Sequence, residues 1–251
     1  MSGGIAIVGL GPGAAELLTP RAAAALAAAT DLVGYQTYLA RAPQRAGQRL
    51  HASDNREELF RARLALTLAA EGRRVAVVSS GDPGVFAMAS AVFEAIEHGN
   101  PAWRALEIEV IPGISAMFAA AARLGAPLGH DFCAISLSDN LKPWETVLAR
   151  LGAAAQAGFV IALYNAASHA RPWQLAAALA LLRTLLPPTT SVALARNVSG
   201  PDEAIELTTL SEVDATRADM RTLVIIGSAA TRRITRADGG AWLYSPRGGA
   251  A

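Results

Sequence analysis

Three loops rich in glycine and proline each border a short apolar run, and their residue types suit close contact with a small ligand. They span residues 9–14, 80–86 and 111–116. Glycine lets the backbone approach a ligand closely, and a helix that begins just after such a loop adds main-chain N–H groups and a partial positive charge. Asp82 supplies a carboxylate that could accept hydrogen bonds from ligand hydroxyls. A plain Asp-Pro-Gly turn at residues 82–84 is the alternative.

Polar side chains gather where two further apolar runs end. Residues 136–145 include Asp139, Asn140 and Lys142, the only lysine of the chain. A helix cap with Pro143 in the first turn would account for one of these residues but not for the whole cluster. Tyr164-Asn165 closes the next apolar run, although an asparagine there is often only a turn residue.

The sequence lacks the motifs on which several other kinds of chemistry depend. The histidines are widely separated, the single cysteine is Cys133, and neither a Gly-x-Ser-x-Gly elbow nor a phosphate-binding Walker loop is present. We therefore expect no resident metal and no hydrolase or phosphotransferase activity. The net charge is +1, so no overall field favours nucleic acid as a partner.

The first loop also fits a variant of the dinucleotide-binding fingerprint, Gly-x-Gly-x-x-Ala. Pro12 removes one main-chain N–H that would face a pyrophosphate, and Asp31 stands at the start of the next predicted strand. A ribose-binding acid should stand at the end of that strand. An NAD-binding or sensory module remains the alternative from a different class of protein.

The elements that position these loops alternate between strand and helix in the first half of the chain. Thr19-Pro20 is typical of a helix start, and Asp54 with Glu57 resembles a capping box. Alternation of this kind predicts an α/β domain over residues 1–125 with a mostly parallel sheet. The predicted strands span residues 5–8, 32–35, 75–78 and 106–111, and the helices begin near Thr19, Asp54, Val85 and Ser115.

The second half predicts another α/β domain over residues 130–236, separated by a Gly/Pro-rich linker at 125–129. Close spacing of its last strands indicates a mixed sheet. The Gly-rich tail, 237–251, is expected to be a flexible tail. No run approaches the roughly 20 apolar residues of a membrane span, and the start of the chain is unlike a secretory signal, so we expect a cytoplasmic protein without a membrane partner. The predicted strands are 132–137, 159–164, 191–196, 204–208 and 222–226, and the helices are 143–157 and 172–185.

Taken in order, four motifs resemble those of the tetrapyrrole (corrin/porphyrin) methylase family, over about residues 4–232. They are residues 8–13, 80–85, 111–116 and 164–165. Longer strings at 53–58, 125–133 and 136–144 are similar to family members that methylate precorrin-3B at C17. One departure is Tyr164-Asn165-Ala166, where relatives commonly have Tyr-Asn-Pro.

The resemblance implies two α/β domains with an active-site cleft between them, S-adenosylmethionine (SAM) bound in a folded conformation in that cleft, and a homodimer. It implies cofactor contacts at Gly81, Asp82, Val85, Phe86, Ser115, Ala116, Ser138, Tyr164, Asn165, Ala195 and Arg196. It places the first loop against the tetrapyrrole, and we expect arginines to hold the carboxylates of that substrate. The expected substrate contacts are Gly9, Gly11, Pro12, Gly13, Arg21, Arg56 and Arg171.

The implied reaction is methylation of precorrin-3B at C17, followed by ring contraction to precorrin-4 with extrusion of C20, in the aerobic branch of cobalamin (vitamin B12) biosynthesis. Methyl transfer from a sulfonium mainly needs positioning, whereas contraction needs general acid–base groups. We expect Asp82, Asp139, Asn140 and Lys142 to supply these groups. The alternative within the family is the anaerobic-branch enzyme that acts on cobalt-factor III; the lack of a cysteine cluster and residues 139–142 favour the metal-free substrate.

Overall fold

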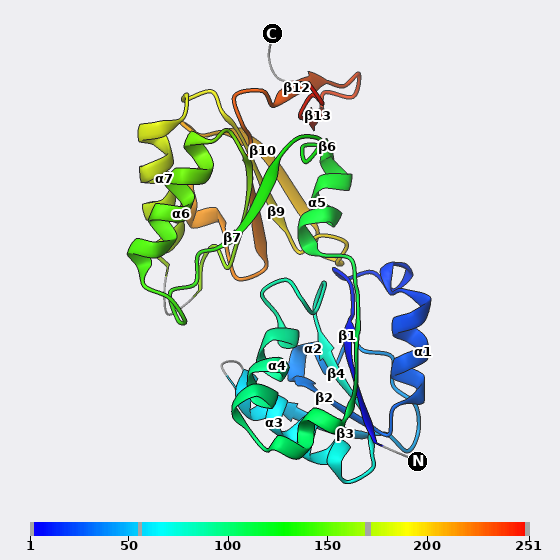
Figure 1. Cartoon of the computed structure of the whole chain (residues 1–251). Helices are drawn as coiled ribbons and strands as arrows, with labels where there is room; N and C mark the ends of the chain where they lie inside the picture. Colours follow the sequence, from blue (N-terminus) through cyan, green and yellow to red (C-terminus); the bar gives the residue numbers. More distant parts are fainter. Residues whose placement is uncertain (1–2, 55–56, 169–171, 249–251) are drawn as a thin grey trace. The chain divides into compact units, whose positions relative to one another are not determined.

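The computed structural model describes residues 3–54, 57–168 and 172–248. Contacts divide the chain into two α/β units, Met1–Ala116 and Met117–Ala251 (Figure 1). The division falls at the start of a helix and not in the predicted linker at 125–129. The reason is that this helix packs within the second unit, where the ring of Phe118 meets that of Phe132 at a centroid distance of 6.3 Å.

The first unit contains one parallel sheet, as predicted. Its strand order is β3-β2-β4-β1-β5, and every neighbouring pair is parallel. The strands are β1 (Gly4–Gly9), β2 (Asp31–Tyr35), β3 (Arg49–Ser53), β4 (Arg74–Ser79) and β5 (Glu107–Ile111). The helices are η1 (Ala15–Leu17), α1 (Pro20–Ala28), α2 (Gln36–Leu39), α3 (Glu58–Ala70), α4 (Met88–His98) and η2 (Pro101–Ala105).

Both faces of this sheet are covered, which explains why its central strands read as continuous apolar runs. Ile7 and Val77 pack with α3 and α4, whereas Val8 and Val78 pack with α1 on the other face. Figure 1 shows α1 on one side of the sheet and α3 with α4 on the other.

Two local helix-start predictions have different outcomes. Thr19 caps α1 as predicted, because its Oγ1 accepts a hydrogen bond from the N–H of Ala22 at 3.1 Å. The N–H of Asp54 does donate to Glu57 Oε2 at 3.1 Å, but α3 begins only at Glu58. The helix thus begins later than predicted, and the Asp54–Glu57 hydrogen bond lies before it.

The second unit contains a mixed sheet, also as predicted. Its strand order is β10-β9-β11-β8-β7, in which only the β7–β8 pair is parallel. The helices α6 and α7 cover one face and α5 lies on the other (Figure 1). The strands are β7 (Phe132–Ser136), β8 (Val160–Tyr164), β9 (Ser191–Arg196), β10 (Ala204–Thr209) and β11 (Thr222–Ile226). The helices are α5 (Ala116–Leu124), α6 (Trp144–Gln156), α7 (Gln174–Leu185) and η3 (Ala215–Arg217).

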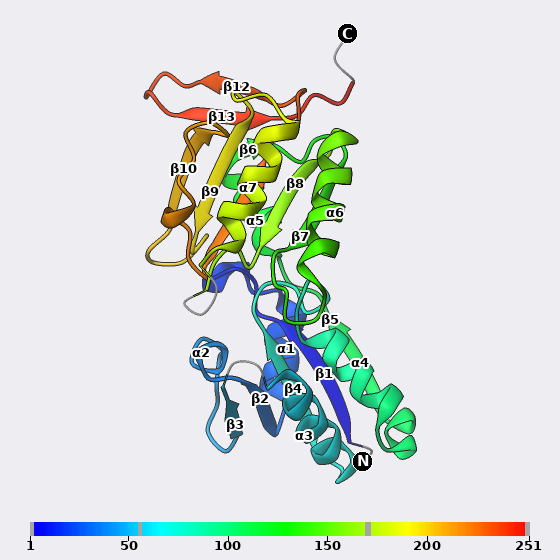
Figure 2. The same ribbon diagram turned by 90° about the vertical axis from the view of Figure 1, so that its left-hand side faces the viewer.

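A small third sheet, with strand order β12-β13-β6, corrects the expectation of a flexible tail from residue 237. Its strands are β6 (Gly125–Ala126), β12 (Arg232–Thr235) and β13 (Ala241–Tyr244). Leu243 is fully buried, so apolar burial orders this part of the tail. Figure 2 shows β12 and β13 side by side at one end of the second unit. No helix of the described residues is long and apolar enough to cross a membrane.

Candidate functional site

The carboxyl ends of the parallel strands in the first unit bring the three predicted loops together. The N–H of Leu10 donates to Ser79 O at 2.8 Å, and Gly11 and Gly81 exchange two main-chain hydrogen bonds of 3.1 and 2.9 Å. Gly81 has a φ of 61°, a conformation that an L side chain rarely adopts. The loops after β1 and β4 are thus joined at their backbones.

The loop after β5 is packed against the same point so closely that only glycine fits. An ideal Cβ on Gly9 would lie 2.6 Å from the nitrogen of Gly113 and 2.7 Å from the carbonyl oxygen of Gly81. A Cβ on Gly113 would overlap the same carbonyl oxygen. The three glycines therefore serve backbone-to-backbone packing at the sheet edge, and this packing fixes where the loops point.

Both carboxylate oxygens of Asp82 accept hydrogen bonds from main-chain N–H groups. Oδ1 accepts from Gly84 at 2.8 Å, within its own loop, and Oδ2 accepts from Gly113 at 3.2 Å. These contacts combine the Asp-Pro-Gly turn with a link between two loops. They give Asp82 a positioning role, while its predicted role in acid–base chemistry stays a prediction.

The remainder of the loop after β4 presents an apolar side chain under backbone strain. Phe86 has a φ of 52° and its side chain is half exposed. A left-handed conformation at a bulky residue costs about 1–3 kcal/mol and concentrates at ligand-binding loops. Val85 beside it is partly buried. In the loop after β5, Ser115 is buried at the start of α5, and Ala116 is the first residue of that helix.

Tyr164 and Asn165 lie at the carboxyl end of β8 in the second unit, as predicted. The phenol oxygen of Tyr164 accepts a hydrogen bond from the N–H of Met117 at 3.1 Å, in the first turn of α5. Asn165 has a φ of 54°, and its Nδ2 donates to Ser136 Oγ at 2.8 Å. Ser136 ends the neighbouring parallel strand β7, and its Oγ also accepts from the N–H of Ser138. The ends of β7 and β8 therefore form one hydrogen-bonded group.

The polar cluster after β7 leads into α6 as predicted. Gln174 Nε2 donates to Asp139 Oδ1 at 3.3 Å, and Gln174 itself is buried. Asn140 is exposed. Lys142 is half-buried, and this burial, together with the nearby charge of Arg150, lowers the pKa of its amine. Asp139 is thus held by a buried amide, and Lys142 gives up its proton more readily than a solvated lysine.

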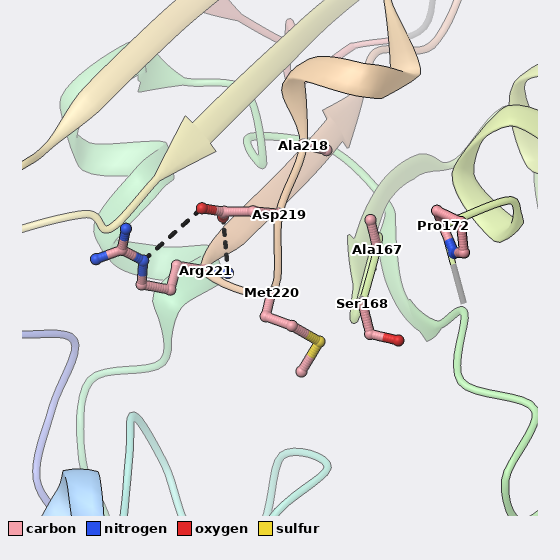
Figure 3. A pocket seen from close by; sticks show the side chains of 7 residues that line it. All are labelled: Ala167, Ser168, Pro172, Ala218, Asp219, Met220 and Arg221. Carbon is pink, nitrogen blue, oxygen red and sulfur yellow. Dashed lines mark hydrogen bonds and ion pairs between the residues drawn. The ribbon is translucent and has the colours of Figure 1, made fainter. Parts of the chain in front are cut away.

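A pocket of about 350 Å³ opens at the edge of the second sheet where β8 ends and β11 begins. Figure 3 shows Ser168 and Met220 lying on opposite sides of it. Its size falls at the lower end of small-molecule sites. The Oγ of Ser168 is buried and has no hydrogen-bond partner in the described part of the chain. The lining residues are Ala167, Ser168, Pro172, Ala218, Asp219, Met220 and Arg221.

The predicted residues at the end of β9 border this pocket without lining it. Arg196 Nε donates to Asp219 Oδ2 at 2.8 Å, which orients a pocket carboxylate (Figure 3 shows the further contacts of Asp219 with Arg221). Ala195 is buried within the sheet. The ion pair and not the alanine therefore connects this strand end with the pocket.

The predicted substrate arginines do not form one group. Arg21 lies on α1 and pairs with Glu109 on β5, its Nε donating to Oε1 at 2.9 Å, so its charge is already matched. Arg56 and Arg171 lie outside the described residues. Gly11, Pro12 and Gly13 follow β1 at the sheet edge described above.

Asp31 has a structural role that argues against the dinucleotide interpretation. It is fully buried at the amino end of β2, the end opposite to the ligand loops. Its Oδ1 accepts from His51 Nε2 at 2.8 Å and from Arg73 Nη1 at 3.1 Å. Burial alone would raise the pKa of this carboxyl, but hydrogen bonds from His51, Thr30 and Arg73 outweigh it, and the pKa lies below its ordinary value.

The loop at residues 218–221 was missed by the sequence analysis. It precedes a strand, and loops before parallel strands lie at the opposite edge from the ligand loops. Because β11 is antiparallel to β8 and β9, its amino end falls beside their carboxyl ends. Only the pairing direction of β11 could have revealed the site. Among the described residues, no group of His, Cys, Asp and Glu side chains could hold a metal ion.

These strand-end loops and the pocket define an α/β protein with glycine-rich loops and a small-molecule-sized pocket at the edges of its sheets. Comparison with known proteins identifies the family. A family model described as Tetrapyrrole (Corrin/Porphyrin) Methylases matches residues 4–214. The chain belongs to this family.

One curated relative and two solved structures illustrate the similarity. The chain is 56% identical to a Sinorhizobium protein named precorrin-3B C(17)-methyltransferase, over 98% of this chain and 97% of the relative. A crystal structure of the methyltransferase CobJ superposes with a TM-score of 0.93 at 54% identity, covering 98% of this chain and all of that one. A uroporphyrin-III C-methyltransferase from Thermus thermophilus, complexed with S-adenosylhomocysteine, gives 0.66 at 25% identity, covering 90% and 97%.

Proposed function

We propose that this protein transfers a methyl group from SAM to C17 of precorrin-3B and promotes ring contraction to precorrin-4, in the aerobic branch of cobalamin biosynthesis. The observation that carries the proposal is the 56% identity, along nearly the whole of both chains, with a relative named precorrin-3B C(17)-methyltransferase. The resemblance of the loops and the fold supports it independently.

The second unit offers a pocket that suits part of SAM. Ala167, Pro172 and Met220 give it apolar walls, and the buried hydroxyl of Ser168 can bond a polar edge of a ligand. We expect Tyr164, Asn165 and the Arg196–Asp219 pair to position this edge of the site. In the first unit we expect Gly81, Val85 and Phe86 to contact the cofactor and residues 9–13 to contact the tetrapyrrole. SAM supplies a methyl group already activated on a sulfonium.

The protein's own part in methyl transfer is therefore positioning, and its acid–base part lies in the contraction step. Removal of a proton from the C20 hydroxyl requires a base whose pKa is near the working pH. We assign this role to Lys142, whose amine belongs to the polar cluster after β7 and has a pKa lowered from its ordinary value by partial burial and by Arg150. Asp139, oriented by Gln174 through its Oδ1, is the second group we assign to proton handling.

Turnover by the purified protein tests the function directly. Incubation with SAM and precorrin-3B is expected to yield methylated, ring-contracted product by mass spectrometry, and cobalt-factor III in a parallel reaction is expected to yield none. Calorimetric titration is expected to show binding of S-adenosylhomocysteine and not of NAD. Turnover of cobalt-factor III alone would assign the anaerobic branch, and binding of NAD alone would refute the methylase assignment.

Lys142→Ala and Asp139→Ala test the contraction residues. Both are expected to slow conversion to precorrin-4 by about 10²-fold or more while leaving S-adenosylhomocysteine affinity unchanged. Asp131→Ala is the matched control, because this exposed carboxylate stands at the other end of β7. If both variants form precorrin-4 at the rate of the control, the assignment is wrong.

We also propose that the protein acts as a cytoplasmic homodimer without nucleic acid or membrane partners. The family resemblance supports the proposed dimer, and the net charge of +1 supports the proposed absence of a polyanionic partner. Light scattering coupled to gel filtration is expected to give twice the chain mass of 26.0 kDa.

A further inference from the structure

A second, smaller pocket lies in the first unit beside the loop that follows β1. It has a volume of about 70 Å³, roughly the space of two water molecules, which matches a single carboxylate group. Leu10, Leu18 and Pro43 give it apolar walls, and Arg41 is its one charged side chain. Arg41 follows α2, which begins directly where β2 ends, so it lies at the same sheet edge as the loop after β1.

Arg41 differs from the other arginines of this unit in having both a pocket and an unmatched charge. It is exposed and forms neither an ion pair nor a side-chain hydrogen bond with any residue the structure describes. Arg21, in contrast, is matched by Glu109, and Arg73 is matched by Asp31. An exposed arginine is ordinarily solvated, but Arg41 also lines a pocket with apolar walls.

Two residues of the pocket lining also offer main-chain donors. The N–H groups of Gly13 and Ala14 line or adjoin the pocket and donate to no acceptor within the described residues. Both residues are partly exposed, so these N–H groups are free to donate to a ligand in the pocket. A carboxylate supplies acceptors to both kinds of donor and a negative charge to the guanidinium.

We propose that Arg41, with the N–H groups of Gly13 and Ala14, forms a subsite for one short aliphatic carboxylate side chain of the tetrapyrrole. This inference rests on the proposed function for the identity of the ligand. The carboxylate lies against the guanidinium, and its methylene groups pack on Leu10 and Leu18. Arg41 is therefore a substrate-binding residue in addition to the predicted Arg21, Arg56 and Arg171.

Substitution of Arg41 tests the subsite. Arg41→Gln is expected to raise KM for precorrin-3B about tenfold, because a charge-assisted hydrogen bond is lost, while KM for SAM stays unchanged. Arg41→Lys keeps the charge but not the fork, so an intermediate KM is expected. The matched control is Arg63→Gln, another exposed arginine of the first unit without an ion pair in the described part of the chain. Thermal unfolding midpoints verify that the variants fold alike.

Binding of uroporphyrin III, measured by fluorescence quenching, separates the subsite from the reaction. The affinity is expected to fall in Arg41→Gln and to stay unchanged in Arg63→Gln. If the wild type converts precorrin-3B but Arg41→Gln matches the control in both assays, the inference fails and the function stands. If the wild type shows no turnover but Arg41→Gln still loses uroporphyrin affinity, the function fails and the subsite stands. Absence of tetrapyrrole binding by the wild type would overturn both.

Discussion

Replacement of Asp31 by alanine is expected to destabilise the first unit without touching the ligand loops. The carboxylate is fully buried at the amino end of β2, and four side chains approach it. They are Thr30, Arg49, His51 and Arg73. Loss of the carboxylate leaves two guanidinium groups and an imidazole facing each other without their common acceptor.

The exposure of the partner side chains places the expected loss of stability near the lower end of the range known for broken buried ion pairs. Removal of one partner from a buried ion pair costs about 3–5 kcal/mol. The side chain of Arg49 is 58% exposed and that of Arg73 is 29% exposed, so both regain part of their hydration when Asp31 is absent. We therefore expect Asp31→Ala to lower the free energy of unfolding of this unit by about 3 kcal/mol.

Native-state hydrogen exchange is the suitable assay because a chain of two units need not unfold in one step. Peptides covering β2 and β3 are expected to lose protection in Asp31→Ala, while peptides covering β8 and β9 keep theirs. Asp131→Ala, whose side chain is 78% exposed, is the control and should change stability by less than about 0.5 kcal/mol. A loss below about 1 kcal/mol in Asp31→Ala would show that the cluster is not a stabilising network.

The same carboxyl determines a pH dependence. Its pKa is lowered in the folded state, so its stabilisation is complete above the unfolded value of about 3.9 and is lost as the pH falls through the folded value. The stability difference between wild type and Asp31→Asn is expected to be constant above about pH 5 and to shrink below about pH 4. A difference that grows on acidification would contradict the assigned protonation state.

Four further substitutions test other parts of the structure. Gly113→Ala forces a Cβ into the backbone of Gly9 and is expected to lower the free energy of unfolding by about 1–3 kcal/mol or more. Gly152→Ala in α6 meets no atom closer than 3.8 Å and should raise it by up to about 1 kcal/mol. Calorimetric unfolding compares the two variants. Tyr164→Phe removes the acceptor of the Met117 N–H and is expected to cost about 1 kcal/mol and to weaken S-adenosylhomocysteine binding, measured by titration. Arg61→Met removes a buried guanidinium bonded to Ser53 Oγ and Asp54 O, and faster hydrogen exchange at the end of β3 is expected, with a loss of about 1–3 kcal/mol.

The sequence was sufficient for the elements that bury apolar runs. β1, β4, β8, β9 and β11 appear where the pattern predicted them, because a strand buried on both faces carries consecutive apolar residues. β3 was missed because it is an edge strand of polar and exposed residues, and α2 because it is a single turn. β13 was missed because the four residues Ala241–Tyr244 stand between stretches of glycine and charged residues that resemble a tail.

The positions of single loops could be predicted better than the contacts between residues far apart in the sequence. Glycine spacing located the loops after β1, β4 and β5, because tight backbone packing requires residues without Cβ atoms. Which charges are already matched could not be predicted, since the Arg21–Glu109 pair joins residues 88 positions apart. For the same reason Arg41 was passed over: whether an arginine already has an acidic partner becomes visible only in the folded chain.

The pairing of β13 with β6 also sets an order of events on the ribosome. The first unit draws all its strands from the first 111 residues, so it can fold while the remainder of the chain is still being synthesised. The three-stranded sheet of the second unit forms later, because β6 pairs with β13, which follows all strands of the five-stranded sheet in the chain. Until β13 is made, Gly125 and Ala126 lack the strand with which they pair in the folded unit.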